Sequence, residues 1–317
     1  MQTRSLGRSG LRTAPLVFGG NVFGWTADEP TSFSLLDALV DAGFTAIDTA
    51  NSYSRWAPGH TGGESETVIG KWLARRQDRE RLLIATKVGA DMGAAGKGLS
   101  RAHIRSSIDA SLQRLQTDYV DLYQAHFDDP ATPIEETLET FAELVHAGKV
   151  RAIGCSNFTA DRIRASLEVS ATRGFPRYES LQPLYNLYDR EPFETELAPL
   201  CVREQIGVIS YYALASGFLS GKYRSQADLA KSSRARTNEK YLTPRGLRIL
   251  EALDRVAAAR KVAAATVAVA WVMAKPGVTA PIASATSLEQ LATLVAASRL
   301  ELGPAEMELL DSASNNS

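Results

Sequence analysis

The sequence predicts an α/β protein with the (β/α)8 TIM-barrel fold. Short β-rich runs alternate with longer amphipathic stretches along nearly the whole chain, and eight such runs occur in 317 residues. An open doubly wound sheet is disfavoured, because no Gly-x-Gly-x-x-Gly sequence follows the first predicted barrel strand. We therefore expect one barrel domain over residues 1–317.

The first predicted element is a hairpin. Residues 4–13 are centred on Gly7-Arg8-Ser9-Gly10, a turn sequence that predicts two short antiparallel strands able to plug the barrel floor. The predicted barrel strands follow in order at residues 15–19, 45–49, 82–87, 119–126, 150–156, 180–186, 207–212 and 279–284. Helical periodicity between them predicts helices at residues 32–43, 65–76, 101–115, 133–148 and 159–174.

Several helix ends carry their own signals. Gly43, Gly148 and Gly174 directly follow the last periodic residue of a helix, where a left-handed backbone is expected. Thr159 and Ser100 precede helices and have side chains suited to an N-cap.

Three segments depart from the regular alternation. Residues 54–65 and 221–244 are long, and they predict extended loops on the C-terminal face of the barrel. The apolar run at residues 262–274 is too short to span a bilayer, so it predicts a buried helix.

The composition excludes several classes of protein. A net charge of -1, with 44% hydrophobic and 22% charged residues, gives no electrostatic basis for binding nucleic acid. No apolar leader is visible in MQTRSLGRSG, so we expect a cytoplasmic protein without a membrane partner. Cys155 and Cys201 are too few for a disulfide framework, and the four histidines lack ligand spacing, so we expect no structural metal.

Polar side chains gather where the predicted strands end. Asp48 and Tyr53 follow the second barrel strand, Lys87 ends the third and His126 ends the fourth. Each alone has an ordinary structural explanation, as a turn aspartate, a solvated lysine or a structural histidine. Because the carboxyl ends of barrel strands meet at one rim, their joint placement favours a site. Further polar residues at this rim are Ser156, Asn157, Gln182 and Tyr211.

A phenol, an ammonium, a carboxylate and an imidazole at one rim suggest a proton donor with its tuning groups. We expect the Lys87 ammonium to favour the phenolate and so to lower the pKa of Tyr53. Asp48 would keep Lys87 charged, and His126 would hydrogen-bond the substrate oxygen. A carbonyl polarised in this way is prepared for hydride attack, but the hydride must come from a cofactor.

The sequence around these residues resembles the aldo-keto reductases over essentially the full chain. The similar segments include IDTANSY, IATKVG, YVDLYQAH and IGCSNF, followed by LQPLYN, YYALASGFLSGKY and PIASATSLEQL. GGNVFGW and ALASGFLSGKY look most similar to the bacterial members of general-stress type. The potassium-channel β subunits share this fold and its tetrad of polar residues.

The resemblance implies roles for individual positions. It makes Asp48, Tyr53, Lys87 and His126 a catalytic tetrad in which Tyr53 is the acid. It implies a substrate wall of Trp25, Tyr53, Trp56, His126 and Phe127, with Tyr212 also narrowing the pocket. The cofactor contacts that it implies are Gly20, Asn21, Asp48, Ser156, Asn157, Gln182, Tyr211, Leu214, Ser216, Gly217, Leu219, Gly221, Lys222, Arg234, Ser284, Thr286 and Gln290.

Within this set, the resemblance assigns different residues to different parts of the cofactor. Ser156, Asn157 and Gln182 would hold the nicotinamide carboxamide, and Tyr211 would stack on the ring. Residues 214–221 would line the pyrophosphate, where backbone N–H groups and glycine allow close approach, and Lys222 would add a charge.

The adenosine end departs from the family pattern. Thr286 stands where relatives often carry Arg, Lys or Ser near a 2′-phosphate, and Thr293-Leu294 replaces a usual Glu-Asn pair. Arg234 and Arg236 in the basic loop could replace the missing cation by folding over the cofactor, or the loop could be a solvated insertion. We expect NADP(H) on family grounds, with NAD(H) as the alternative.

These inferences predict a reductase that converts aldehydes or ketones to alcohols and binds a small-molecule carbonyl substrate as a monomer or a weak homo-oligomer. A barrel aldolase or isomerase with a Schiff base on Lys87 is a second interpretation, disfavoured because Asp48 should raise the pKa of that lysine. A nicotinamide-binding redox sensor with weak reductase activity is a third, less favoured because no gating segment precedes the predicted barrel.

Overall fold

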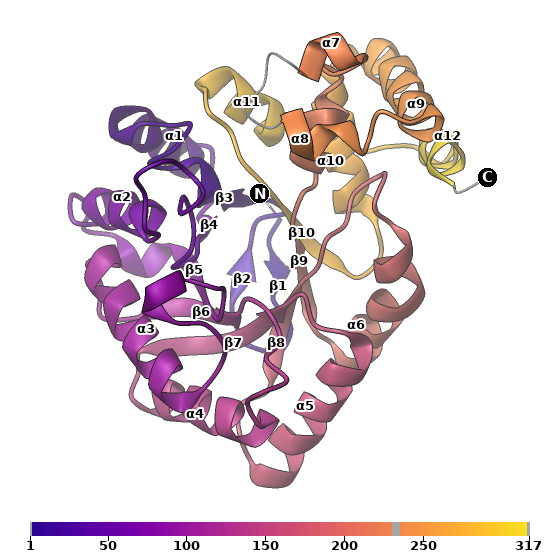
Figure 1. Ribbon diagram of the computed structural model, residues 1–317. Helices are drawn as coiled ribbons and strands as arrows, with labels where there is room; N and C mark the ends of the chain where they lie inside the picture. Colours follow the sequence, from indigo (N-terminus) through magenta and orange to yellow (C-terminus); the bar gives the residue numbers. More distant parts are fainter. Residues whose placement is uncertain (1, 230–234, 316–317) are drawn as a thin grey trace.

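A computed structural model describes residues 2–229 and 235–315. In this part of the chain eight parallel strands close into a barrel in the order β10-β3-β4-β5-β6-β7-β8-β9, which confirms the (β/α)8 prediction (Figure 1). The barrel strands are β3 Val17–Gly19, β4 Ala46–Asp48, β5 Leu83–Val88, β6 Val120–Ala125, β7 Val150–Ser156, β8 Tyr178–Gln182, β9 Gly207–Ser210 and β10 Val278–Ala283.

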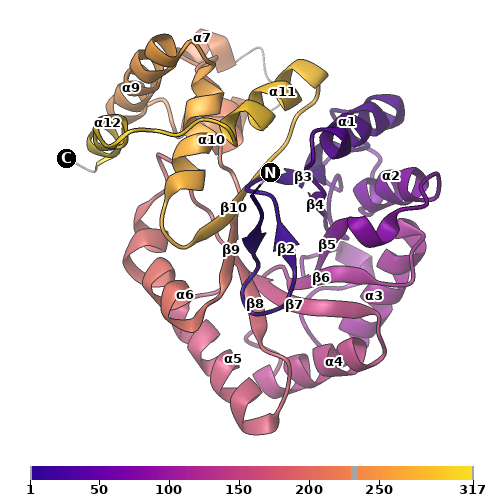
Figure 2. The same ribbon diagram turned by 180° about the vertical axis from the view of Figure 1, so that it is seen from behind.

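The predicted N-terminal hairpin is also present. Its strands, β1 (Arg4–Ser5) and β2 (Arg12–Thr13), pair antiparallel across the end of the barrel that Figure 2 shows from behind. Leu6 and Leu11 are buried in one cluster with apolar side chains of the barrel strands, so the hairpin closes the barrel floor as expected.

Gly7 allows this floor to pack tightly. Its φ of +61° lies in the left-handed region, and a Cβ there would stand 2.2 Å from the carbonyl oxygen of Glu179. Only glycine tolerates both conditions without displacing the end of β8.

The helices form a ring around the barrel (Figure 1). The long ones are α1 Glu29–Asp41, α2 Glu64–Leu73, α3 Arg101–Leu115, α4 Ile134–His146, α5 Ala160–Arg173, α9 Pro244–Arg260, α10 Ala264–Ala274, α11 Leu288–Ala297 and α12 Pro304–Ser314. The short ones are α6 Ala198–Glu204, α7 Gln226–Leu229 and α8 Ala235–Glu239. All five helices predicted by periodicity are present, with ends displaced by three residues or fewer.

The predicted helix ends are largely confirmed. Gly43, Gly148 and Gly174 have φ values of 89°, 73° and 68°. Thr159 caps α5 by accepting a hydrogen bond from the backbone N–H of Arg162. Ser100 occupies the N-cap of α3, but among the described residues its side chain accepts no capping hydrogen bond. The Glu136 carboxylate of α4 accepts the N–H of Arg101 instead, at 2.9 Å.

Most strand ends differ from the prediction by one or two residues, and two segments differ more clearly. β8 is Tyr178–Gln182 rather than residues 180–186, because Pro183 has no N–H to continue the ladder and the chain then pairs only at an isolated bridge of Leu184. The segment predicted as a loop at residues 221–244 contains α7 and α8. The apolar run at residues 262–274 forms α10, which is buried as expected.

No single helix in the described ranges is long and apolar enough to cross a membrane. The adjoining helices α9 and α10 pass a test of length and composition only together, as a pair bent by 99°.

The barrel interior changes character from floor to rim. Near the floor, it holds apolar side chains such as Val17, Leu83 and Leu122. Towards the C-terminal ends of the strands, it holds fully buried polar side chains: Asp48 and Lys87 at 0% exposure and Gln182 at 2%. A polar layer on an apolar base places the chemistry at the rim, as the fold predicts.

Candidate active site

Asp48, Lys87 and Tyr53 form one connected group at the rim. Lys87 Nζ donates to Asp48 Oδ2 at 2.7 Å, to the carbonyl oxygen of Thr49 at 2.8 Å and to Tyr53 Oη at 2.8 Å. The Tyr53 hydroxyl donates to Asp48 Oδ2 at 3.1 Å. The predicted association of these three residues is therefore present in the fold.

The local sequence explains why they meet. Asp48 shares the inward face of β4 with Ala46, and Lys87 shares that of β5 with Ala85, because strand side chains alternate with a period of two. After β4 the chain turns, with the N–H of Tyr53 donating to the carbonyl of Ala50 at 3.1 Å. This turn returns Tyr53 over the end of its own strand.

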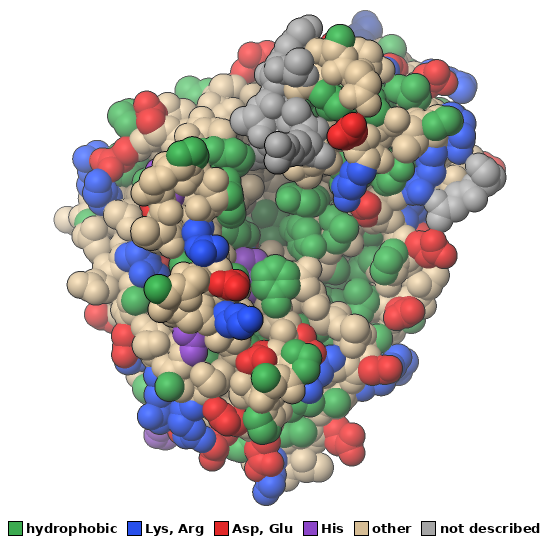
Figure 3. All heavy atoms as spheres, viewed as in Figure 1, with side chains coloured by type: hydrophobic (Ala, Val, Ile, Leu, Met, Phe, Trp, Pro, Cys, Tyr) green, Lys and Arg blue, Asp and Glu red, His purple; other side chains and the backbone are tan. Residues whose placement is uncertain are grey.

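Only part of the group faces open space. Tyr53 and His126 are among the described residues that line a cavity of about 960 Å³ at the barrel mouth. Asp48 and Lys87 lie beneath them with 0% exposure. Figure 3 shows the hollow on this face, with hydrophobic side chains gathered along it. A ligand in the cavity therefore reaches the buried ion pair through the Tyr53 hydroxyl.

The pKa values of this group correct two expectations. Burial, reinforced by the Asp48 carboxylate, raises the pKa of Tyr53 well above its ordinary value, whereas Lys87 was expected to lower it. Burial also lowers the pKa of Lys87, although Asp48 acts in the opposite direction. Desolvation of the charged form is the largest cause in both cases; the Asp48 carboxylate adds to it at Tyr53 and opposes it at Lys87. Tyr53 therefore holds its proton in the neutral pH range.

His126 sits beside Tyr53 as a neutral ring. Its Nδ1 lies 3.5 Å from Ser52 Oγ, and its ring stacks on Phe127 with centroids 4.7 Å apart. Burial and the Lys87 ammonium lower the pKa of His126 to about 3. A neutral imidazole can donate or accept a hydrogen bond at a bound oxygen without adding charge.

This pKa predicts how stability depends on pH. Between the ordinary value of 6.5 and about 3, the unfolded chain protonates His126 and the folded chain does not. The free energy of unfolding should therefore fall as the pH falls through this window, with His126 contributing at most about 1.4 kcal/mol per pH unit. Urea unfolding of His126→Asn should show a correspondingly shallower loss, and an unchanged slope would contradict the assignment.

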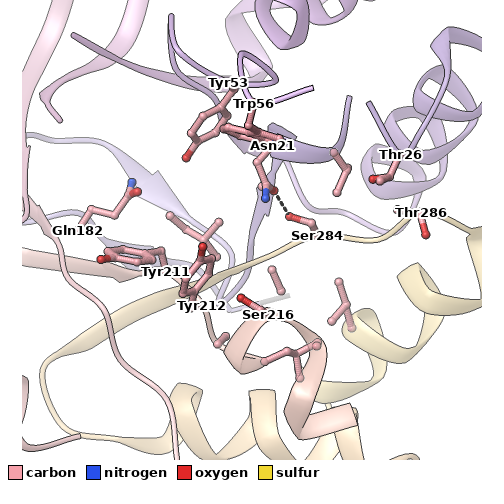
Figure 4. A pocket seen from close by; sticks show the side chains of 18 of the residues that line it. Asn21, Thr26, Tyr53, Trp56, Gln182, Tyr211, Tyr212, Ser216, Ser284 and Thr286 are labelled. Atoms are coloured by element: carbon pink, nitrogen blue, oxygen red, sulfur yellow. Dashed lines mark hydrogen bonds between the residues drawn. The ribbon is translucent and has the colours of Figure 1, made fainter. Parts of the chain in front are cut away.

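The residues expected to hold a nicotinamide carboxamide lie next to the tetrad. Ser156 Oγ donates to the carbonyl oxygen of Gln182 at 2.8 Å, and Asn157 Oδ1 accepts from the Tyr211 hydroxyl at 2.8 Å. Gln182 Nε2 donates to Asp48 Oδ1 at 2.9 Å. All four predicted residues line the cavity, and Figure 4 shows Gln182 and Tyr211 on one side of it with Tyr53 opposite.

Most of the other predicted cofactor residues line the same cavity. They are Asn21, Leu214, Ser216, Gly217, Lys222, Ser284, Thr286 and Gln290. Gly20, Leu219 and Gly221 belong to adjoining segments and are not among its described lining residues. Arg234 and the side chain of Arg236 fall outside the described residues.

Two backbone features leave room for a long ligand. A Cβ at Gly19 would stand 2.6 Å from Ser284 Oγ, so the floor of the groove admits no side chain there. Ala215, Ser216 and Gly217 have consecutive positive φ values of 47°, 57° and 94°. Ser216 and Gly217 of this left-handed stretch line the cavity, and such a conformation persists only where the surroundings hold it. The residues present therefore fit an extended dinucleotide.

The far end of the groove is uncharged in its described part. The Gln290 side chain accepts from the Thr286 N–H at 2.9 Å, and Ser284 Oγ donates to Asn21 Oδ1 at 2.6 Å (Figure 4). Thr293 and Leu294 complete this end. The lining there is neutral, so a phosphate would need a cation from elsewhere in the chain.

Exposed aromatic side chains also line the cavity, and Figure 4 shows Trp56 beside Tyr53 and Tyr212 beside Tyr211. Trp56 is 50% exposed, Phe127 is 46% exposed and Tyr212 is 41% exposed, and all three line the cavity. Trp25, expected in the substrate wall, is not among the described lining residues and packs edge-on against Trp56 with centroids 5.6 Å apart. Trp25 therefore packs against Trp56 rather than lining the cavity.

Some lining residues were missed from the sequence. Ser52 lies between Asp48 and Tyr53 in the motif, so its position could have been predicted. Ala263 and Ala265 gave no comparable signal, because they reach the cavity only where α10 packs against the turn at Ala215–Ser220.

The described residues do not favour metal chemistry or a Schiff base on Lys87. Among residues 2–229 and 235–315, no cluster of three His, Cys, Asp or Glu side chains could hold a metal ion. A Schiff base on Lys87 is opposed by its position, because Nζ is fully buried and engaged in three hydrogen bonds beneath Tyr53. Because burial lowers the pKa of Lys87 although Asp48 was expected to raise it, the Schiff base is opposed by the geometry and not by the charge of Asp48.

Comparisons with known proteins agree with the geometry. The model of the aldo/keto reductase family matches residues 15–315. The uncharacterized oxidoreductase YrpG of Bacillus subtilis is 35% identical, covering 98% of this chain and 95% of its own. Aldo-keto reductase YhdN of the same organism is 36% identical over 85% and 78% of the two chains. A probable voltage-gated potassium channel subunit beta of rice, Oryza sativa, is 34% identical over 92% and 89%.

Proposed function

Because the chain belongs to the aldo/keto reductase family, we propose that it reduces aldehydes or ketones to alcohols, reversibly, with NADP(H) as the hydride carrier. The observation that carries this proposal is the Tyr53 hydroxyl, which reaches the cavity while hydrogen-bonded to the buried pair of Lys87 and Asp48. The nicotinamide supplies the hydride when bound, and the protein must supply the proton.

The tetrad divides the proton transfer among its members. Tyr53 holds its proton at neutral pH and donates it to the carbonyl oxygen of the substrate. The phenolate that remains lies 2.8 Å from Lys87 Nζ, whose ammonium stabilises it. Asp48 compensates the charge of Lys87, and His126 offers a neutral hydrogen-bonding nitrogen beside the same oxygen.

A direct experiment tests this function. The purified protein is titrated with NADPH and with NADH while tryptophan fluorescence is followed, because Trp56 lines the cavity. The nucleotide-loaded protein then receives 4-nitrobenzaldehyde, a planar carbonyl suited to the aromatic wall, and nucleotide oxidation is measured. Quenching followed by oxidation supports the proposal, and failure to bind either nucleotide overturns it.

The choice of NADP(H) yields a separate prediction. The described groove end is neutral, so we infer that Arg234 and Arg236 supply the charge that meets the 2′-phosphate. Arg234→Ala with Arg236→Ala should weaken NADPH binding about tenfold or more and leave NADH nearly unchanged. Fluorescence titration measures both affinities.

The matched control removes two exposed arginines elsewhere, Arg164 on α5 and Arg203 on α6. This pair should affect neither nucleotide. Equal weakening of NADPH and NADH by the loop variant would show that Arg234 and Arg236 do not meet the 2′-phosphate.

A second candidate function is a nicotinamide-binding redox sensor with weak reductase activity. The similarity to the probable potassium channel subunit beta of rice supports this second function. A sensor should bind the nucleotide tightly but turn over less than once per minute with every aldehyde offered, whereas a reductase should pass through many cycles within about a minute.

A further inference from the structure

Gln124 is a fully buried amide that the tetrad does not explain. It belongs to β6, two residues before His126, and its Cα is the ladder partner of Lys87. Gln124 Nε2 donates to Asp48 Oδ1 at 3.4 Å. Its Oε1 accepts from Gln182 Nε2 at 3.4 Å. The Gln124 side chain therefore contacts both the carboxylate of the buried ion pair and the amide of Gln182.

The hydrogen bonds divide the two oxygens of Asp48 between different partners. Oδ1 accepts from the amides of Gln124 and Gln182. Oδ2 accepts from Lys87 and Tyr53. A partial rotation of the carboxylate would weaken all four contacts, so the two amides help to fix the plane of the carboxylate with one oxygen towards Lys87 and Tyr53.

A glycine lies beside Gln124 on the neighbouring strand. Gly154 of β7 is the ladder partner of Gln124, and a Cβ there would stand 2.1 Å from Ser180 Oγ and 3.3 Å from Gln124 Cγ. Ser180 is therefore the main reason why residue 154 carries no side chain, and the stem of Gln124 is a secondary contact.

We propose that Gln124 is a positioning residue for proton transfer, which together with Gln182 fixes the plane of the Asp48 carboxylate so that one of its oxygens faces Lys87 and Tyr53. Gln182 also lines the cavity, so the amide pair connects the nicotinamide end of the site to the buried carboxylate. This role rests on the proposed reductase function.

The first test replaces the amide by a thioether of similar length. Gln124→Met should lower kcat for 4-nitrobenzaldehyde about tenfold, because Asp48 loses one of its orienting donors, and should leave KM and nucleotide affinity within about twofold. The control is Leu122→Met, an interior side chain of the same strand one layer nearer the floor, which should keep wild-type kcat. Equal loss in both variants, or none in Gln124→Met, overturns the proposal.

The second test does not depend on activity. Gln124→Glu places a second carboxylate beside Asp48, and two buried carboxylates resist joint ionisation. The folded variant retains a proton that the unfolded chain releases, so its stability should fall as the pH rises from about 4 to about 8. Adding Asp48→Asn should reduce this slope, because the like charge is gone.

An equal slope with and without Asp48→Asn would show that residue 124 does not act on Asp48, and the positioning role would be wrong. Failure of the wild-type protein to reduce any aldehyde would instead reject the proposed function and leave the unfolding experiment to decide about Gln124. The two failures are thus distinguishable.

Discussion

Tyr53→Phe is expected to lower the rate of carbonyl reduction by about 10²–10⁴-fold, the usual contribution of a positioned general acid. Tyr53 is the member of the buried group whose hydroxyl reaches the cavity, and the phenyl ring fills the same space without the proton. Nucleotide affinity should stay nearly intact, because Ser156, Asn157 and Gln182 keep their contacts.

The measurement combines single-turnover oxidation of bound nucleotide with fluorescence titration. Tyr123→Phe is a matched control, because Tyr123 is buried away from the cavity and its hydroxyl has no hydrogen-bond partner among the described residues. That variant should reduce aldehydes at the wild-type rate. Unchanged turnover in Tyr53→Phe would exclude Tyr53 as the acid.

The fold was predictable because barrel strands leave strong local patterns. β7 matches its prediction at both ends, since Val150–Ser156 is buried throughout except at Arg151 and follows the helix-ending Gly148 by two residues. β8 was placed too late, since its start is set by pairing with β7 and its apolar pattern continues past Pro183. Helices within the segment at residues 221–244 were missed, because each has five residues or fewer and shows no complete period.

The residues of the site could be predicted from the sequence, but their pKa values could not. Asp48, Lys87 and His126 stand at strand ends, and the barrel topology alone brings such positions together. The raised pKa of Tyr53 depends on how completely the surrounding chain removes water, which strand position does not encode. The role of Gln124 could not be predicted from the sequence either. Its side chain lies one layer below the rim, and only its distance to Asp48 in the fold connects it to the site.

Lys87→Met is expected to have the second large effect, on stability as well as on activity. Lys87 and Asp48 form a salt bridge at 2.7 Å with side-chain exposures of 0% and 1%. Removing one partner leaves the other charge buried without compensation, which costs about 3–5 kcal/mol of unfolding free energy. Carbonyl reduction should be lost too, because Tyr53 loses the donor that stabilises its phenolate.

The pH dependence separates this cause from a packing defect. A protonated Asp48 needs no counter-ion, so the deficit of Lys87→Met should be smaller at about pH 5 than at about pH 8. A cavity left by a poorly fitting methionine would destabilise the protein equally at both pH values. Urea unfolding of the variant and the wild type at the two pH values gives the comparison.

The double variant Asp48→Asn with Lys87→Met completes the cycle. It removes both charges and leaves a neutral amide that Gln182 can still contact, so most of the lost stability should return. Activity should not return, because the phenolate of Tyr53 still lacks a cation. Recovery of activity would show that the ion pair serves only to maintain the fold. A persistent stability deficit would place the cost of Lys87→Met in packing around β5 rather than in the unpaired carboxylate.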